Sequence, residues 1–354
     1  MFVLSAGRSG STLLTRMLQQ NDALCSVSEF WTSFLMQGFG DPVVSGARFW
    51  ELLSVSPTWF GNFVAKARAA EAMPSEIIYD EARGRYRLEE CPPLLTMTLP
   101  ALTDDPDSLF DLLADEVPRW GLARVSAHAA RLFSFLRGHF HRRLWVERSG
   151  LSYWYAPDMI SAYPDARFVH LVRNGREVLL SMMGMRFFDP IVRFDWLTGR
   201  LEHPDRPVRR RIFFKHRNVA RALMLRFADA ERVVTGQHGR ARPYSLPDRL
   251  DHGRQAHIYA RFWAGSADLA LQAMESLPPE RLHVLRYEDM VDDPRGTLGD
   301  LMAFMLPGED HVDWIERVAH MPRVQKGRWD DLDPEVARQV DEIIAPVNVR
   351  LGYG

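Results

Sequence analysis

The sequence predicts an α/β fold in which helices cover a central parallel sheet. Short apolar runs suited to strands alternate with longer stretches of helical spacing, and the first apolar run leads directly into a loop of small residues that opens a helix. The strand candidates are residues 2–5, 143–147, 166–172 and 281–287, and the helix candidates that follow them are residues 11–20, 154–163, 175–183 and 294–306.

Two stretches interrupt this alternation. Residues 30–140 are helical and rich in aromatic side chains, and residues 185–253 are rich in arginine and proline. The sequence contains neither an internal repeat nor a long low-complexity linker. We therefore interpret both stretches as insertions over the sheet, within a single domain that spans residues 1–354.

The composition is that of an ordinary globular protein. The chain has 354 residues, of which 46% are apolar, and its formal charge of -2 gives no global reason to expect nucleic acid or an anionic membrane as a partner. The two cysteines, Cys25 and Cys91, favour buried thiols in a reducing compartment. No apolar run is long enough to span a membrane, and the first strand leaves no room for a signal segment, so we expect a cytoplasmic protein.

The loop S-A-G-R-S-G-S-T at residues 5–12 predicts an anion site. Its place between a strand and a helix points several backbone N–H groups and the positive helix end at one spot. Compared with the ATP-binding pattern G-x-x-x-x-G-K-[ST], Gly10 and Thr12 match, but Ser5 replaces the first glycine and Ser11 replaces the lysine. Arg8 restores a cation, and its planar fork suits an oxyanion with several equivalent oxygens.

A second basic site is predicted where the strand candidate at 166–172 ends. Arg173 follows this strand, Asn174 and Glu177 form a capping pair for the next helix, and Ser181 lies just over two helical turns beyond Arg173. Ligands bind at the carboxyl ends of parallel strands, so Arg173 and Ser181 could grip one dianionic group. The alternative is an arginine that satisfies helix-end carbonyls or an acidic side chain.

These two motifs, F-V-L-S-A-G-R-S-G-S-T-L-L at 2–14 and F-V-H-L-V-R-N-G-R-E-V-L-L-S at 168–181, resemble those of the sulfotransferases that use 3'-phosphoadenylyl sulfate (PAPS). The resemblance extends to the tyrosylprotein, carbohydrate and bacterial branches. Three more segments follow in the family's order: W-V-E-R-S-G at 145–150, V-L-R-Y-E-D-M-V-D-D-P at 284–294 and Q-K-G-R-W at 325–329.

The resemblance implies a P-loop-type three-layer domain that transfers a sulfuryl group from PAPS to an acceptor hydroxyl or amine. Residues 40–140 and 185–253 carry no match, and the two insertions would form the acceptor side. No metal is expected, because the transferred group is neutral as it passes between oxygens.

The resemblance also implies roles for individual residues. Arg8, Ser9, Gly10, Ser11 and Thr12 would hold the 5'-phosphosulfate of PAPS. Its 3'-phosphate would lie between Arg173 and Ser181, and Tyr287 would lie near the adenine or its ribose. The C-terminal loop that closes over the nucleotide would comprise Lys326, Gly327, Arg328 and Trp329.

Sulfuryl transfer needs a base for the acceptor and a cation for the departing phosphate oxygen. Glu29 follows the loop helix and a short apparent strand, at a position that resembles the glutamate base of the tyrosylprotein-type enzymes. Other members use a histidine, and the candidates here are His128, His139, His141 and His170. Arg148 stands where relatives have a catalytic lysine. An arginine can stabilise the oxygen but cannot readily donate a proton to it, so Arg8 would share this role.

The acceptor is the least specified part of the prediction. Nine aromatic residues lie between Phe30 and Phe63, which suits either a pocket for an apolar or aromatic alcohol or the insertion's own core. The arginine-rich run at 206–217 is either a surface that steers an acidic acceptor or a solvated helix face. Two alternative functions remain open: a P-loop kinase for a small molecule, and a nucleotide-binding protein without turnover.

Overall fold

The computed structural model describes residues 1–35, 41–56, 77–184, 252–324 and 329–353, together with residues 64, 65, 68, 188 and 192. Nearly all of the insertion predicted at 185–253 lies outside these residues. The chain forms two compact units: Met1–Ala65, Pro74–Arg173 and Ala270–Lys326 make the first, and Lys66–Met73, Asn174–Leu269 and Gly327–Gly354 make the second. That the whole chain acts as one domain stays a prediction.

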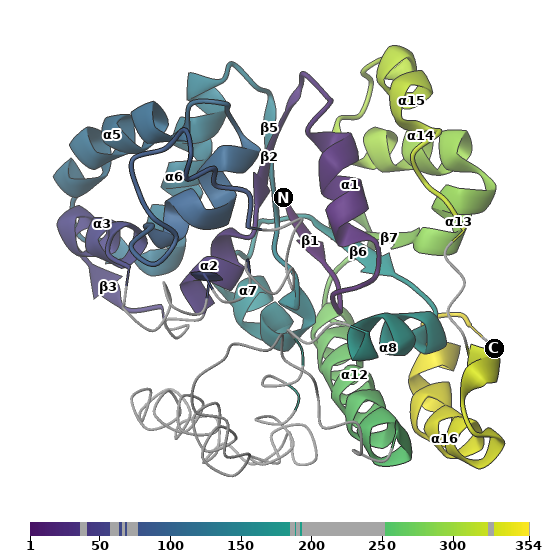
Figure 1. Cartoon of the computed structure of the whole chain (residues 1–354). Coiled ribbons are helices and arrows are strands. Elements are labelled where there is room, and N and C mark those ends of the chain that lie inside the picture. The colour runs from purple at the N-terminus through teal and green to yellow at the C-terminus, as the bar shows by residue number, and fades with distance from the viewer. Residues whose placement is uncertain are drawn as a thin grey trace, which may run out of the picture. The chain divides into compact units, whose positions relative to one another are not determined.

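The first unit is built on a parallel sheet of five strands with the order β2-β5-β1-β6-β7 (Figure 1). The predicted strands are confirmed to within two residues at either end. Their bounds are β1 Phe2–Leu4, β5 Leu144–Arg148, β6 Phe168–Val172 and β7 Leu282–Arg286, and the short strand before Glu29 is β2 Leu24–Ser28. The first strand of the chain is therefore the central strand of the sheet.

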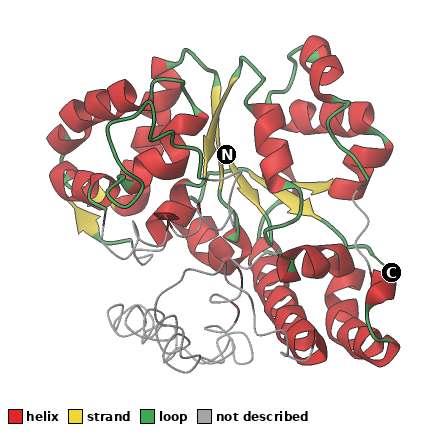
Figure 2. Cartoon of the chain, viewed as in Figure 1, coloured by secondary structure: helices red, strands yellow, loops and turns green. Residues whose placement is uncertain are grey.

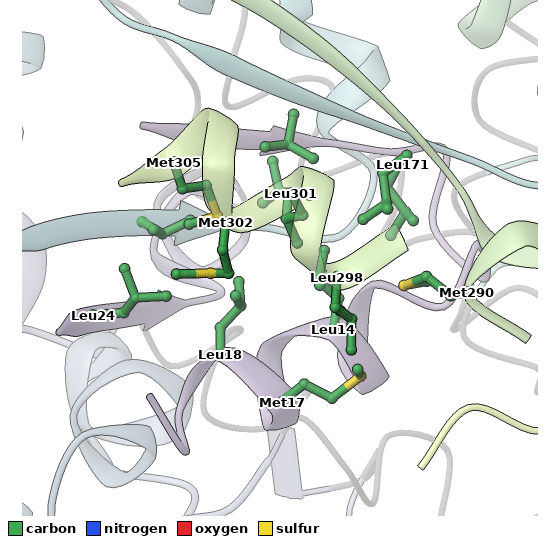
Figure 3. Packing of buried hydrophobic residues seen from close by; sticks show 14 of the residues in the cluster. Leu14, Met17, Leu18, Leu24, Leu171, Met290, Leu298, Leu301, Met302 and Met305 are labelled. Carbon is green, nitrogen blue, oxygen red and sulfur yellow. The ribbon is translucent and has the colours of Figure 1, made fainter. Parts of the chain in front are cut away.

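Successive side chains of a strand point to opposite faces of the sheet, and both faces are covered. On one face, Val3 and Leu171 join a buried cluster with Leu14 of α1 and Leu298 of α14 (Figure 3). On the other face, the ring of Phe2 packs against Tyr163 at a centroid distance of 4.6 Å. The predicted α/β class, with three layers, is confirmed.

Helices occupy the predicted positions after the strands (Figure 2). The helices expected from the sequence are α1 Ser11–Leu18, α7 Ala156–Ala162, α8 Gly175–Met183 and α14 Pro294–Met305. Of these, α8 belongs to the second unit. The other helices of the first unit are α2 Phe30–Leu35, α3 Gly46–Ser54, α5 Pro106–Glu116, α6 Val125–His139, α13 Tyr287–Asp292 and α15 Val312–Val318. Short strands β3 Val43–Val44 and β4 Ala123–Arg124 pair antiparallel. A single-residue corner, Glu29, connects β2 to α2.

Part of the aromatic stretch that begins at Phe30 contributes to the core, whereas Trp50 is only partly buried and packs against Phe110 at a centroid distance of 4.8 Å. Phe30, Trp31 and Phe49 are fully buried. Phe30 packs edge-on against Phe133 of α6, and Phe49 stacks on His128. Of the two interpretations of this stretch, the insertion's own core accounts for these three rings. The structure does not describe the side chain of Phe34, and it does not describe Phe39, Trp59, Phe60 and Phe63 at all.

The second unit contains α8, α16 Pro334–Arg350 and most of α12 His252–Met274. Gly175 at the start of α8 lies so close to Trp263 that a Cβ would stand 2.5 Å from the indole ring. Its N–H donates to Asn348 Oδ1 at 2.9 Å, and Arg176 forms two hydrogen bonds to Asp341. Gly175, which lies within the second motif, therefore allows close packing of three helices.

Candidate active site

The sheet places the predicted site residues at the carboxyl ends of neighbouring parallel strands. Glu29 follows β2, Arg148 ends β5, the anion loop follows β1, Arg173 follows β6 and Tyr287 follows β7. Neighbouring strands are about 4.8 Å apart, so three spacings, roughly 14 Å, separate the strand of Glu29 from that of Arg173. The candidate base and the candidate 3'-phosphate arginine thus lie on opposite sides of the loop, in the order of the strands.

The loop between β1 and α1 is where the sequence predicts an anion site. Gly7, Arg8 and Gly10 have positive φ angles of 77°, 57° and 90°, in the region that glycine adopts readily. Gly10 is the N-cap of α1 and makes no side-chain cap hydrogen bond, so the first-turn N–H groups have no intrahelical acceptor. Arg8 is a non-glycine residue in the left-handed region, which carries backbone strain of the kind found at functional sites.

Tyr287 packs directly on this loop. A Cβ on Gly10 would stand 2.3 Å from Cδ2 of Tyr287, so only glycine fits beneath the ring. The guanidinium of Arg173 lies 4.6 Å from the centroid of the same ring, and its Nη1 donates to the Arg8 carbonyl at 3.3 Å. The Tyr287 hydroxyl donates to the carbonyl of Arg323 at 2.9 Å. Arg173 and Tyr287 are therefore brought to the anion loop; contact of Tyr287 with an adenine or ribose stays a prediction.

Glu29 and Arg148 form a buried ion pair. Arg148 Nη1 contacts Glu29 Oε1, and both residues are 3% exposed. The Gly150 N–H donates to both carboxylate oxygens, at 3.2 and 3.0 Å, and Arg148 Nε donates to Thr15 Oγ1 of α1 at 2.7 Å. The structure thus joins the candidate base, the candidate cation and the loop helix.

The backbone of Glu29 explains how the carboxylate reaches this place. Glu29 has φ 55°, in the left-handed region, and its N–H donates to the Arg148 carbonyl at 2.8 Å. One residue in this conformation turns the chain from β2 into α2 and directs the carboxylate toward β5. A non-glycine residue held in this way is typical of a functional site.

The family model described as "Sulfotransferase family" matches residues 1–237 and 210–306. The chain belongs to the sulfotransferase family.

Three solved structures are similar to this sulfotransferase. The sulfotransferase domain from the curacin biosynthetic pathway is 16% identical, with a TM-score of 0.48, over 100% of this chain and 97% of that chain. For the sulfotransferase domain of the Synechococcus PCC 7002 olefin synthase, the identity is 15%, the TM-score 0.45 and the coverage 99% and 91%. For sulfotransferase STF9 from Mycobacterium avium the values are 15%, 0.42, and 99% and 76%. No curated protein matched the chain.

The remaining predicted nucleotide residues of this sulfotransferase belong to the second unit or lie outside the described residues. Ser181 is on α8 in the second unit, and its part in holding a phosphate with Arg173 stays a prediction. Trp329 is also in the second unit, where the Arg176 guanidinium lies 5.2 Å from its ring centroid. Lys326, Gly327 and Arg328 lie outside the described residues.

None of the four histidine candidates has a described contact with Glu29 or Arg148. His128 stacks with both Phe49 and Trp120, and its Nε2 lies 3.0 Å from the Val44 carbonyl. His170 is buried, its Nε2 lies 2.6 Å from the Tyr153 hydroxyl, and burial lowers its pKa to about 3. These contacts give both rings structural roles. His139 and His141 are exposed, at and just beyond the C-terminal end of α6.

Both cysteines are free and buried, as predicted, and burial raises the pKa of each thiol to about 12, so neither is an activated nucleophile. Among the described residues, no group of three or more histidine, cysteine or acidic side chains could hold a metal ion. Within the same part of the chain, no helix combines the length and apolar character needed to cross a membrane.

The sequence reasoning missed Thr15 and Gly150, which hold Arg148 and Glu29. Thr15 is one helical turn beyond Ser11, and Gly150 comes two residues after Arg148. The rule that ligand-binding residues gather at carboxyl strand ends would have pointed to Gly150. The contact of Thr15 with Arg148 spans 133 residues and has no local signal.

Proposed function

We propose that this sulfotransferase transfers a sulfuryl group from PAPS to an acceptor hydroxyl or amine, with Glu29 as the base. The observation that carries the proposal is the buried pair of Glu29 and Arg148 at adjacent carboxyl strand ends, one strand from the anion loop. A base and a cation next to an anion site are the groups that sulfuryl transfer requires.

The anion loop fits a phosphosulfate. Its glycines have the backbone that lets N–H groups converge, and the uncapped start of α1 adds the positive helix end. Arg8 supplies a cation within the loop. Arg173, one strand away, supplies a second cation for a separate phosphate, which favours a nucleotide with two anionic groups over a simple 5'-nucleotide.

The reaction has a balanced course with these residues. When bound, PAPS supplies the sulfuryl group: a bond from the acceptor oxygen to sulfur forms while the bond from sulfur to the bridging phosphate oxygen breaks, and the electron pair stays on the phosphate. Glu29 takes the acceptor proton. Once Glu29 is neutral it no longer balances Arg148, whose guanidinium is then available to stabilise the negative charge on the leaving phosphate. Arg148 keeps its own proton throughout.

The test of the donor is thermal stabilisation by 3',5'-adenosine bisphosphate, compared with ATP-Mg and with 5'-AMP. A ligand at a hundred times its dissociation constant adds about 2.7 kcal/mol to the free energy of unfolding, which gives a clear shift in melting temperature. We expect the bisphosphate to stabilise most. Stabilisation by ATP-Mg alone would support a small-molecule kinase instead.

The test of turnover is release of 3',5'-adenosine bisphosphate from PAPS with a panel of phenols, alcohols and amines as acceptors. An excess of EDTA should leave the rate unchanged, because no step in the proposed reaction uses a metal. Bisphosphate binding without release on any acceptor would support a non-catalytic nucleotide-binding protein.

A further inference from the structure

Four consecutive residues at the end of β5 hold the corner that carries Glu29. Glu147, Arg148, Ser149 and Gly150 face the chain from Glu29 to Thr32. Arg148 and Gly150 contact the Glu29 carboxylate itself. Ser149 and Glu147 are fully buried and accept hydrogen bonds from the backbone behind it. The second pair has no role in the reaction described above.

The Ser149 hydroxyl, in the segment just after β5, caps the first turn of α2. Its Oγ accepts from the Trp31 N–H at 2.9 Å and from the Thr32 N–H at 3.2 Å. These are N–H groups of the first turn, which have no acceptor inside the helix. The usual N-cap position is Glu29, whose carboxylate is turned away toward Arg148 and Gly150. Ser149 therefore replaces the cap that Glu29 does not provide.

Glu147 completes the arrangement from behind. The Ser149 hydroxyl donates to Glu147 Oε1, so its single proton and both of its lone pairs are used. Among the described residues, Glu147 Oε2 has no hydrogen-bond partner. Burial, and secondarily the charge of Glu29, raises the pKa of Glu147 to about 8 despite the opposing hydrogen bond from Ser149. A neutral Glu147 places no second negative charge beside Glu29.

We propose that Ser149, supported by Glu147, is a positioning residue for the reaction: its hydroxyl fixes the start of α2 and so frees the Glu29 carboxylate to act as the base. This inference rests on the proposed function of Glu29. Its physical reason is competition, because an uncapped helix start attracts the nearest acidic side chain. Without Ser149, the Glu29 carboxylate would turn back to cap Trp31 and Thr32 and leave Arg148.

The experiment compares Ser149→Ala with wild type, using PAPS and the panel acceptor that wild type turns over fastest. We expect kcat to fall on the order of 10²-fold, since a displaced catalytic group loses about that much. The KM for PAPS and the affinity for 3',5'-adenosine bisphosphate should stay within about twofold of wild type. Ser149→Cys keeps the size of the side chain and weakens its hydrogen bonds, so it provides the same test if the alanine variant does not fold.

Matched variants separate positioning from simple loss of stability. Ser266→Ala removes another buried serine hydroxyl, one that donates to the Trp263 carbonyl in α12, and should lower the melting temperature without changing kcat. Glu147→Gln keeps an oxygen for the Ser149 proton and should keep most of kcat, whereas Glu147→Met removes that acceptor and should behave like Ser149→Ala.

The outcomes distinguish the two proposals. If Glu29→Gln retains turnover, Glu29 is not the base and the proposed function fails in that part. If Glu29→Gln abolishes turnover while Ser149→Ala leaves kcat unchanged, the positioning role of Ser149 is overturned and the proposed base stands. A fall in kcat with an equal weakening of bisphosphate affinity would also overturn it, because the damage would then extend to the anion loop.

Discussion

Arg148 and Glu29, which are 119 residues apart in the chain, form an ion pair that is shielded from solvent and joins the carboxyl ends of β5 and β2. Each residue also has a second anchor, Thr15 for the arginine and the Gly150 N–H for the carboxylate. A buried pair with satisfied partners is sensitive to removal of one member, because the other is left as an uncompensated charge. The pair is therefore both a structural connection and a candidate catalytic unit.

Removal of the Arg148 guanidinium should strongly destabilise the folded protein. Arg148→Met should lower the free energy of unfolding by about 3–5 kcal/mol, since Glu29 is left buried beside only the Gly150 N–H. Denaturant unfolding measures the change. Arg295→Met is the matched control: Arg295 and its partner Glu316 are 63% and 53% exposed, and an exposed pair contributes about 1 kcal/mol or less. A loss in Arg148→Met as small as that of the control would contradict the buried-pair account.

Removal of the base should separate binding from turnover. Glu29→Gln keeps the size of the side chain and an oxygen for the Gly150 N–H, so affinity for 3',5'-adenosine bisphosphate should stay within about twofold. Release of the bisphosphate from PAPS should fall about 10²–10⁴-fold, the usual contribution of a general base. Calorimetry and steady-state kinetics give the two values. Retained turnover would leave a histidine as the base to be found.

Arg173 should select the nucleotide with a 3'-phosphate. Arg173→Ala should weaken the binding of 3',5'-adenosine bisphosphate about tenfold or more, because a charge-assisted contact is lost. The affinity for 5'-AMP should change little. Arg167→Ala is the control at the other end of β6: this arginine donates to the carbonyls of Phe304 and Met305. We expect Arg167→Ala to lower stability without altering the ratio of the two affinities. Equal weakening of both nucleotides by Arg173→Ala would argue against a 3'-phosphate at this position.

Gly10 should tolerate no side chain, because a Cβ would clash with a neighbouring ring. Gly308 is the control that separates this clash from the effect of a positive φ angle. Both glycines have positive φ, 90° and 80°, but a Cβ on Gly10 meets the Tyr287 ring whereas nothing lies within 4 Å of one on Gly308. Gly308→Ala should therefore lower the free energy of unfolding by about 1–2 kcal/mol from backbone conformation alone. Gly10→Ala should lower it further and should also weaken bisphosphate binding. Equal destabilisation by the two substitutions would show that the Tyr287 ring can move aside without lowering the free energy of unfolding.

Glu147 should make the protein less stable as the pH rises. Its pKa is about 8 in the folded chain against an ordinary value of 4.5, so between these values the folded state holds a proton that the unfolded state has lost. The stability it contributes is complete below about pH 4.5 and is lost as the pH rises toward 8. The charged and titratable groups around it are Glu29, Arg148, Tyr155, Tyr163 and the α-amino group of Met1.

Glu147→Gln removes this dependence, and the difference in melting temperature between the variant and wild type should grow in favour of the variant from pH 5 to pH 8. Because His170 is present in both proteins, its own titration cancels in that difference. A difference that does not change with pH would mean that Glu147 is ionised in the folded protein.

The strands and their following helices were predictable because they depend on local patterns. The apolar run from Phe2 and the small-residue loop before Ser11 indicate a strand, an anion-binding turn and a helix without knowledge of any distant residue. The same holds for α8, whose predicted bounds match those observed. Composition was less informative for the aromatic stretch after Phe30, since a pocket wall and a core are equally apolar; only packing shows that Phe30, Trp31 and Phe49 are interior.

Local patterns in the sequence were enough to predict the α/β class, the small-residue loop after the first strand, and the positions of Glu29, Arg148 and Arg173 at or next to strand ends. The tertiary structure decided their order, because strand order is set by which buried faces pack together and not by position in the chain. Pairing of β2 with β5 brings Glu29 to Arg148 and Ser149, and pairing of β6 with β7 brings Tyr287 to Arg173 and Gly10. These contacts join residues more than a hundred positions apart, for which the sequence carries no local signal.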